Sequence, residues 1–217
     1  MELFATGARD PLKVLVLGCH CDDIEIGCGG TMLRLAQSHP NAEITWAVLS
    51  AEGERRDEAE RSAQAFTAGA AQLDLRFATF QDGYFPAFSA AVKDWFEELK
   101  PTIDPDVIFT HYGHDLHQDH RLVAELTWNT FRRHLILEYE VPKYDGDLGN
   151  PNVFVELDEP LVARKLALIR EHFTSQSARH WFDDELFRGL MRLRGMHAAP
   201  PTRYAESFYG RKLSFSP

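Results

Sequence analysis

Two short segments of the chain carry side chains that could hold a metal ion. One begins at His20 and reads HCDDIEIGCGG, and the other begins at His114 and reads HDLHQDH. Imidazole nitrogens and carboxylate oxygens are usual zinc ligands, and a catalytic zinc site keeps three protein ligands and one open position. His20, Asp23 and His120 could supply such a set. Asp22 would then remain beside the activated water as a general base.

A simpler interpretation of the first segment needs no metal. Asp22 and Asp23 would cap a helix that begins near Gly29 or Thr31, and His20 would be a buried histidine with satisfied hydrogen bonds. The second segment favours the metal site. Three histidines and two aspartates within seven residues are unusual for a solvated turn.

The segments that must position these residues alternate between strand and helix patterns. Apolar runs rich in β-branched residues predict strands at 14–17, 43–50, 73–80, 106–112 and 135–139. Helices are predicted between them at 31–38, 54–70, 88–100 and 118–134. This alternation predicts an α/β fold with a Rossmann-like, mostly parallel sheet flanked by helices. Because ligands bind at the carboxyl ends of parallel strands, the two polar segments converge if their strands are neighbours.

The chain is expected to form a single domain over residues 1–217. Residues 1–140, approximately, would be the Rossmann-like core, and 141–217 an extension that completes the pocket. The extension contains a predicted strand, VFVELDE, and a predicted helix at 159–173. The tail beyond Ser175 is rich in aromatic residues but has no regular pattern.

Composition excludes several classes of protein. The 217 residues are 44% hydrophobic and 26% charged, as in soluble globular proteins. The net charge is −10 and no basic cluster is present, so nucleic acid is not an expected partner. The sequence has no apolar run of about 20 residues and no signal peptide pattern, which predicts no membrane span and a cytoplasmic location. The cysteines Cys19, Cys21 and Cys28 are expected to be reduced and packed in the core.

The two polar segments resemble those of a known family. HCDDIEIGCGGT followed by HQDHR is similar to the HPDDE and HxDH signatures of the LmbE/PIG-L family of zinc-dependent N-deacetylases. The resemblance continues, in the family's order, through GERRDEAERSAQAF, FQDGYF, KLALIREHFTSQ and RYAESF. It implies an LmbE-like fold and removal of an N-acetyl group from an amino sugar or glycoconjugate. The implied cofactor is Zn²⁺ or another divalent metal such as Fe²⁺, and a homo-oligomer is compatible with the family.

The resemblance also implies a role for each matching residue. His20, Asp23 and His120 correspond to the metal ligands, Asp22 to the base, His117 to the electrophilic or acid histidine, and Asp119 to the partner of His117. Two positions depart from the family pattern. Cys21 stands where proline is usual, and Ile24 stands where the first glutamate after the aspartates is usual. Neither position is a ligand, so metal binding is expected to survive.

Two further residues have both a functional and a structural interpretation. The resemblance puts Arg55 near the pocket, where a guanidinium could hold acetate or substrate oxygens. The alternative is an ion pair on the helix surface with Glu58 or Glu60. Asp82, in FQDGYF, is either a substrate-hydroxyl acceptor or a turn former. The other polar residues near the second segment, expected to line the pocket mouth, are His111, His114 and Asp115.

Two other functions stay open at the level of sequence. One is a metal-dependent hydrolase that acts on a different amide or an ester. The other is a non-catalytic metal-binding protein, in which a fourth protein ligand would close the site.

Overall fold

The chain folds around one mixed sheet, seen in a computed structural model that describes residues 11–213. The strand order of this seven-stranded sheet is β3-β2-β1-β4-β5-β7-β6. The parallel strands are β1 (Lys13–Gly18), β2 (Glu43–Val48), β3 (Gln72–Phe77), β4 (Val107–His111) and β5 (Leu135–Tyr139). β7 (Tyr204–Gly210) runs antiparallel to both of its neighbours, β5 and β6 (Val153–Leu157). The predicted α/β fold with a mostly parallel sheet is confirmed.

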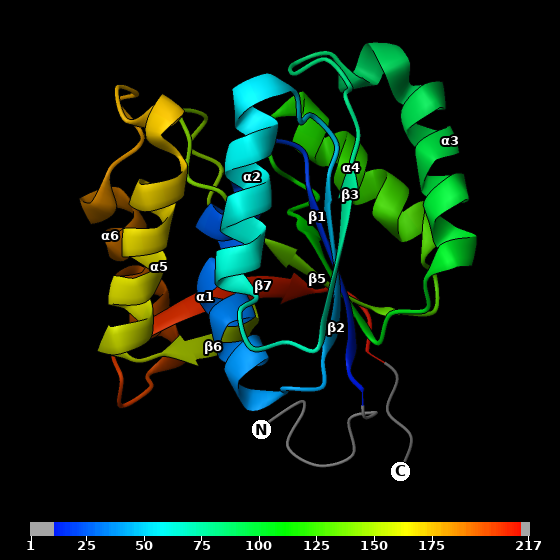
Figure 1. Cartoon of the computed structure of the whole chain (residues 1–217). Coiled ribbons are helices and arrows are strands. Elements are labelled where there is room, and N and C mark those ends of the chain that lie inside the picture. The colour runs from blue at the N-terminus through cyan, green and yellow to red at the C-terminus, as the bar shows by residue number, and fades with distance from the viewer. Residues whose placement is uncertain (1–10, 214–217) are drawn as a thin grey trace.

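Helices cover both faces of the sheet (Figure 1). One face carries α1 (Asp23–Ser38), α2 (Gly53–Phe66), α5 (Glu159–His172) and α6 (Asp184–Ala198), and the other carries α3 (Ser89–Leu99) and α4 (Gln118–Thr130). In the described part of the chain, three single turns of 3₁₀ helix lie between these elements: η1 (Phe85–Phe88), η2 (Lys100–Thr102) and η3 (Thr174–Gln176). Of the helices within residues 11–213, none is long and apolar enough to cross a membrane.

Strand β1 shows why both faces need helices. Val14 and Val16 belong to the apolar cluster under α1, α2, α5 and α6, whereas Leu15 and Leu17 belong to the cluster under α3 and α4. Successive side chains of a strand point to opposite faces. All four side chains are buried, and this explains why the sequence of the strand is a continuous apolar run.

Helix α1 begins earlier than the sequence predicts. It starts at Asp23, so the predicted start near Gly29 or Thr31 is wrong. Gly27 and Gly30 lie inside this helix, where no larger residue would fit. A Cβ at Gly27 would overlap the Tyr139 ring, and a Cβ at Gly30 would overlap the Leu157 side chain. The glycines therefore permit close packing of α1.

A kink interrupts α1 where Cys28 adopts φ −144° and ψ 18°. Two residues of the extension bind the backbone groups around this kink. Glu206, on β7, accepts hydrogen bonds from Gly30 N–H at 2.8 Å and Thr31 N–H at 2.6 Å. Lys165, on α5, donates to the Ile26 carbonyl at 2.7 Å and pairs with Glu206 at 2.7 Å. A buried ion pair thus completes the hydrogen bonding of a broken helix.

The extension continues the sheet of the core. The predicted strand at VFVELDE and the predicted helix at 159–173 correspond to β6 and α5. The tail that shows no regular pattern in the sequence forms α6 and β7, and β7 inserts between β5 and β6.

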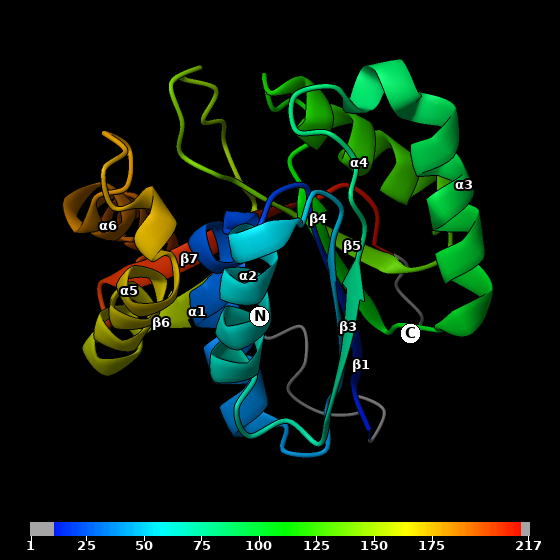
Figure 2. The same ribbon diagram turned by 45° about the horizontal axis from the view of Figure 1, so that its top comes forward.

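The strand order reverses between β1 and β4. The chain runs from β1 through β2 to β3 on one side, and from β4 to β5 on the other. In open α/β sheets the crevice at such a reversal, outside the carboxyl ends of the strands, is the usual ligand site. Figure 2 shows loops from both halves of the chain gathered around these strand ends.

Candidate functional site

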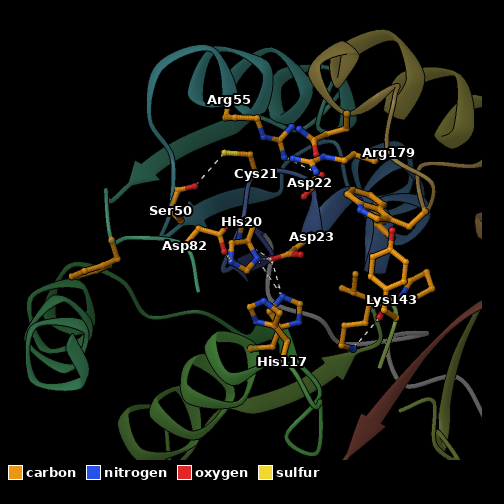
Figure 3. A pocket seen from close by; sticks show the side chains of 18 of the residues that line it. His20, Cys21, Asp22, Asp23, Ser50, Arg55, Asp82, His117, Lys143 and Arg179 are labelled. Atoms are coloured by element: carbon orange, nitrogen blue, oxygen red, sulfur yellow. Dashed lines mark hydrogen bonds and ion pairs between the residues drawn. The ribbon is translucent and has the colours of Figure 1, made fainter. Parts of the chain in front are cut away.

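A pocket of about 720 Å³ lies at the carboxyl ends of the parallel strands. The segment after β1 contributes His20, Asp22 and Asp23, and the segment after β4 contributes His117 and His120. The extension adds a wall that includes Lys143, Tyr144, Arg179 and Trp181. Figure 3 labels His20, Asp22, Asp23, His117, Lys143 and Arg179 among these residues, and their side chains face a common space. The adjacency of β1 and β4 is what brings the two polar segments together.

The three predicted metal ligands converge at one side of this pocket. His20 Nδ1 lies 3.3 Å from Asp23 Oδ2 and 3.3 Å from His120 Nε2. The Asp23 and His120 atoms lie 3.5 Å apart. Two ligands about 2.0–2.1 Å from a tetrahedral zinc ion would be separated by about 3.3–3.4 Å. The donor atoms therefore have the spacing and the chemistry that a divalent metal requires.

Local backbone structure fixes the Asp23 carboxylate. Asp23 is the first residue of α1, and its Oδ2 accepts a hydrogen bond from His20 N–H at 2.7 Å. Asp22 precedes the helix at the N-cap position, but its side chain makes no capping hydrogen bond. The capping interpretation of Asp22 is therefore wrong, and its carboxylate is available for another role.

The charges around the triad favour a bound cation. Burial lowers the pKa of His20, but the Asp23 and Asp119 carboxylates outweigh burial and raise this pKa well above its usual value. Burial and the neighbouring His111 lower the pKa of His120 to about 4. His120 is therefore neutral at pH 7, and neutral imidazole is the form that binds metals.

Each histidine predicted to be a ligand has a carboxylate at its other ring nitrogen. His120 Nδ1 lies 3.0 Å from Asp115 Oδ2. His20 Nε2 lies 2.9 Å from Asp82 Oδ1 and 3.4 Å from Asp119 Oδ2. Carboxylates in these positions set the tautomer and the orientation of metal-binding histidines.

The Asp119 carboxylate is predicted to pair with the His117 ring, but among the described residues its hydrogen bonds go to other groups. Asp119 accepts hydrogen bonds from Gly83 N–H at 2.6 Å and Phe85 N–H at 3.0 Å, and its Oδ2 also faces His20. Two backbone donors from the 83–85 segment hold this carboxylate, and the hydrogen bond between Asp119 and His117 is made by the Asp119 N–H, which donates to His117 Nδ1. Asp119 therefore supports a predicted ligand and the loop that carries Asp82.

His117 occupies the N-cap position of α4 and lines the pocket. Its Nδ1 accepts a hydrogen bond from Asp119 N–H at 3.3 Å, so the proton of the neutral ring is assigned to Nε2. Its ring packs edge-on to His20, with centroids 5.1 Å apart. Burial and the nearby His20 lower the pKa of His117. His117 thus remains a neutral N–H donor near neutral pH.

Asp22 lies beside the triad and pairs with Arg55, whose Nη2 is 2.9 Å from Asp22 Oδ2. Burial raises the pKa of Asp22, and the Arg55 charge opposes this rise. Arg55 also pairs with Glu58 at 2.9 Å, which is the ion pair that the structural alternative anticipated. Glu58 in turn accepts hydrogen bonds from Ser175 N–H and Oγ. The predicted contact of Arg55 with substrate stays a prediction.

The structure is compatible with both interpretations of Asp82, as a turn former and as an acceptor for a substrate hydroxyl. Gly83 follows it with φ +80°, a value that favours glycine, so the segment is a tight turn. The Asp82 side chain is 72% exposed and lines the pocket, where it can also meet a ligand. Its contact with substrate is therefore still a prediction.

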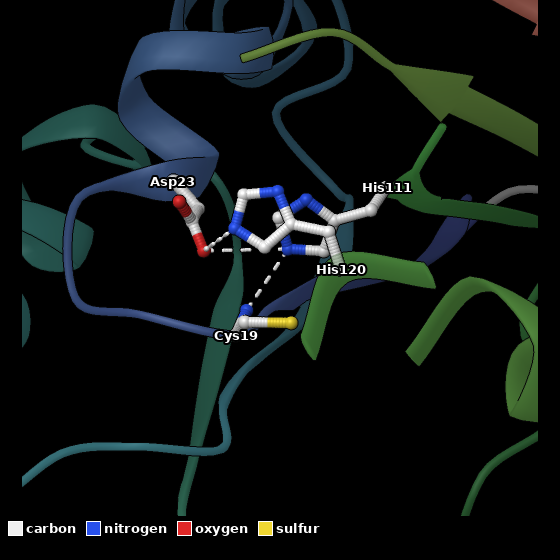
Figure 4. A group of neighbouring side chains, drawn as sticks. All are labelled: Cys19, Asp23, His111 and His120. Atoms are coloured by element: carbon white, nitrogen blue, oxygen red, sulfur yellow. Dashed lines mark hydrogen bonds and ion pairs between the residues drawn. The ribbon is translucent and has the colours of Figure 1, made fainter. Parts of the chain in front are cut away.

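A second set of potential ligands lies behind the triad. One ligand atom each from Cys19, Asp23, His111 and His120 falls within 4.8 Å of the others (Figure 4). His111 Nε2 accepts a hydrogen bond from Cys19 N–H at 3.0 Å, which engages its lone pair. Burial and Asp23 raise the pKa of the Cys19 thiol well above its usual value, which disfavours the thiolate ligand. The triad with His20, which borders the pocket, is the better set for a catalytic ion.

Three residues expected at the mouth lie elsewhere. His111 and Asp115 are buried beneath the triad, and His114 is exposed but is absent from the pocket lining. Of the two residues that depart from the family pattern, Ile24 is fully buried in the core, and Cys21 donates from Sγ to the Ser50 carbonyl at 3.4 Å. Neither replaces a donor atom of the triad.

The fold and the pocket define an α/β protein with a candidate catalytic metal centre, and sequence comparison identifies its family. The model of the PIG-L family, described as GlcNAc-PI de-N-acetylase, matches residues 15–131, more than half of the chain. The chain therefore belongs to the PIG-L family.

Individual relatives agree with this assignment. The chain is 29% identical over 169 residues to the uncharacterized deacetylase YaiS of Escherichia coli, covering 73% of this chain and 89% of that protein.

Solved structures share the fold at low sequence identity. The N,N'-diacetylchitobiose deacetylase from Pyrococcus horikoshii superimposes with a TM-score of 0.68 at 20% identity, over 95% of this chain and 88% of that one. The 4-carboxy-2-hydroxymuconate hydratase GalB from Pseudomonas putida gives a TM-score of 0.72 at 15% identity, over 95% and 98% of the two chains. Because the same fold carries a deacetylase and a hydratase, the reaction must be argued from the site.

Proposed function

We propose that this protein is a metal-dependent hydrolase that removes an N-acetyl group from an amino sugar or glycoconjugate. The observation that carries the proposal is the mutual spacing of 3.3–3.5 Å between the donor atoms of His20, Asp23 and His120, with the Asp22 carboxylate beside them. The deacetylase relatives and the PIG-L family support the same reaction class.

The donor set suits Zn²⁺, and two nitrogens with one carboxylate oxygen would also suit Fe²⁺. When bound, a divalent metal supplies a Lewis acid for the acyl carbonyl and lowers the pKa of water. The closed, non-catalytic alternative needs a fourth protein ligand. One candidate nitrogen, His111 Nε2, already accepts the Cys19 N–H, which supports an open site.

Asp22 is the proposed general base. Its carboxylate is buried next to Asp23, and burial raises its pKa toward the working pH, where a base transfers protons most effectively. Asp22 takes a proton from the attacking water as the oxygen of that water bonds to the acyl carbon. The C–N bond then breaks, the proton passes to the amine nitrogen, and acetate leaves.

His117 is the proposed hydrogen-bond donor to the acyl oxygen, while the proton taken by Asp22 serves the leaving amine. Its neutral ring carries the proton on Nε2, because Nδ1 accepts from the backbone of Asp119. A positioned N–H donor stabilises the negative charge that develops on the acyl oxygen. The lowered pKa of His117 keeps this donor in its neutral form.

The pocket is consistent with a sugar-sized substrate. Its volume of about 720 Å³ lies in the range of small-molecule sites. Asp82 and Arg55 are the proposed contacts for substrate oxygens, and Trp181 and Tyr144 add aromatic surface at the wall formed by the extension. A cytoplasmic location and self-association also stay predictions.

Acetate release from N-acetylated sugars tests this function directly. Zinc-loaded wild-type protein should release acetate, and removal of the metal with a chelator should abolish the release. Asp22→Asn should retain zinc and lose about 10²–10⁴-fold in kcat, the usual contribution of a general base. Near-normal turnover by Asp22→Asn would exclude Asp22 as the base. Zinc binding without acetate release across amino sugars and glycoconjugates would exclude the proposed reaction.

A further inference from the structure

A buried carboxylate, Asp115, holds the far side of a proposed metal ligand. Its Oδ2 lies 3.0 Å from His120 Nδ1, and its Oδ1 accepts a hydrogen bond from His117 N–H at 2.8 Å. Asp115 is 1% exposed. One side chain therefore orients His120 and fixes the backbone at the start of α4.

Lys143 anchors this carboxylate from the extension. Its Nζ donates to Asp115 Oδ2 at 2.8 Å and to the Val141 carbonyl at 3.2 Å. It also pairs with Asp147 at 2.6 Å, and Asp147 accepts a hydrogen bond from Leu116 N–H at 2.7 Å. These contacts join the 112–117 segment to the 141–147 segment, and Lys143 appears at the pocket wall in Figure 3.

The two ligand histidines are therefore supported differently. Asp119, near His20, also accepts two backbone N–H groups, and the closer partner of His20 is the exposed Asp82. Asp115 and Asp119 are both buried, but Asp115 Oδ2 lies closer to its ring nitrogen, at 3.0 Å against 3.4 Å for Asp119, and Lys143 pairs with the same Asp115 oxygen. An imidazole that donates Nδ1–H to Asp115 must present the lone pair of Nε2 to the triad.

We propose that Asp115 and Lys143 form a positioning pair that holds His120 in the tautomer and orientation required for metal binding, and that couples this ligand to the substrate-facing wall. The inference rests on the metal site of the proposed function. Asp115 acts through His120 and Lys143 acts through Asp115, so the direct consequence is a change in metal affinity. Because the segment of Lys143 also carries Tyr144 and Asp145 of the pocket, metal binding should order this wall as well.

Zinc affinity of the metal-free protein, measured by competition with a chelating dye, tests the pair without any substrate. Asp115→Ala should weaken zinc binding about 10–100-fold, the usual cost of losing such a partner. Asp115→Asn should weaken it less, since an amide oxygen still accepts from Nδ1–H. Lys143→Met should also give a smaller loss, because Asp115 stays in place.

Asp147→Ala and Asp147→Asn are the matched controls. They make the same substitutions at a carboxylate that pairs with Lys143 but has no hydrogen bond or ion pair with His120 among the described residues. Both should bind zinc within about threefold of wild type, since they leave the Asp115 contact with His120 intact. The visible absorption bands of Co²⁺ bound to the protein report ligand geometry. They should change in Asp115→Asn and stay as in wild type in Asp147→Asn.

Equal zinc affinity in the Asp115 variants and wild type would overturn the inference. So would equal losses in the Asp115 and Asp147 variants, which would indicate a general structural effect. If wild type binds zinc but releases no acetate, the affinity series still decides the positioning role while the proposed reaction fails. If wild type binds no zinc, the inference and the proposed metal site both fail.

Discussion

The two histidines proposed as metal ligands face the triad with opposite ring nitrogens. The Nδ1 atom of His20 faces the triad, and its Nε2 atom lies beside the Asp82 and Asp119 carboxylates. In His120 the arrangement is reversed, because Nε2 faces the triad and Nδ1 lies beside the Asp115 carboxylate. A carboxylate beside one nitrogen favours a proton there and a lone pair on the other. The supporting acids therefore decide which nitrogen each histidine gives to a metal.

A substitution at His117 should separate catalysis from metal binding. The His117 ring lines the pocket but is not one of the three converging donors, so His117→Ala should retain full zinc content. Its kcat should fall more than its KM rises, because the contact to the acyl oxygen is made mainly in the transition state. Metal analysis and steady-state kinetics check both parts.

His120→Ala is the comparison for this variant. It removes a proposed ligand, so its zinc content should fall sharply while the protein stays folded. Loss of zinc from His117→Ala, or full zinc in His120→Ala, would reverse the assigned roles.

The ion pair between Arg55 and Asp22 predicts a change in the pH–rate profile. Burial raises the pKa of Asp22 and the Arg55 charge holds it down, so Arg55→Gln should raise this pKa further. A base with a raised pKa stays protonated to higher pH, and the acidic limb of kcat/KM should move upward. Arg55→Lys keeps the charge and should move the limb less. An unchanged limb in Arg55→Gln would contradict the assignment of that limb to Asp22.

Sequence reasoning at the residue scale predicts which side chains meet but not how they pair. The convergence of His20, Asp23 and His120 follows from two strand ends that are adjacent in the sheet. The partner of Asp119 depends on the Gly83 and Phe85 N–H groups, which belong to a loop 34–36 residues away in sequence. A contact set by the path of a distant loop leaves no signal in the spacing of HQDH.

At the scale of elements, the broken helix α1 depends on the extension. At its kink, Gly30 N–H and Thr31 N–H donate hydrogen bonds to Glu206, and the Ile26 carbonyl accepts one from Lys165. Asp23 and Asp22 lie at the start of this helix. The ion pair of the extension therefore also supports the element that presents two acids to the pocket.

Lys165→Met should strongly destabilise the protein. The substitution leaves Glu206 buried without its cation, and breaking a buried pair in this way typically costs about 3–5 kcal/mol. Denaturant unfolding measures the loss, and Lys100→Met at an exposed position is the control. The double variant Lys165→Met with Glu206→Gln should lose less than the sum of the single losses, because both single changes disrupt one interaction. Additive losses would show that the two side chains act independently.

Strands β1, β2, β4 and β5 are predictable because each contains a local apolar run, but α6 and β7 are not predictable in this way. Asp183 caps α6 by accepting from Glu185 N–H and Leu186 N–H, a start signal that is visible in the sequence. Gly195 weakens the helical pattern, yet it is required where a Cβ would overlap the Arg203 carbonyl. The position of β7 between β5 and β6 depends on long-range pairing, which local patterns do not encode.

At the scale of the whole molecule, the site joins distant parts of the chain. His20 and His120 are 100 residues apart, and the Lys143 contact adds the extension to the same cluster. The unfolded chain cannot present these donors together, so a metal that binds them binds the native state in preference. Metal affinity and fold stability are therefore linked.

Zinc should raise the thermal stability of the protein in proportion to its affinity. At a free concentration of one hundred times Kd, a ligand specific for the native state adds about 2.7 kcal/mol to the free energy of unfolding. For a chain of this size that corresponds to about 5–11 °C in Tm, because each kcal/mol shifts Tm by roughly 2–4 °C. Calorimetry or circular dichroism of metal-free protein with and without zinc measures the shift.

Variants at the site distinguish this linkage from nonspecific stabilisation. Asp22→Asn keeps all three proposed ligands, so zinc should still raise its Tm. His120→Ala lacks one ligand and should show little zinc-dependent shift. At the same zinc concentration Asp115→Ala should shift less than wild type, since a 10–100-fold weaker Kd reduces the linkage free energy by about 1.3–2.3 kcal/mol. A zinc shift in His120→Ala as large as in wild type would mean that the metal binds elsewhere, because linkage requires that the stabilising ion occupy the donors removed.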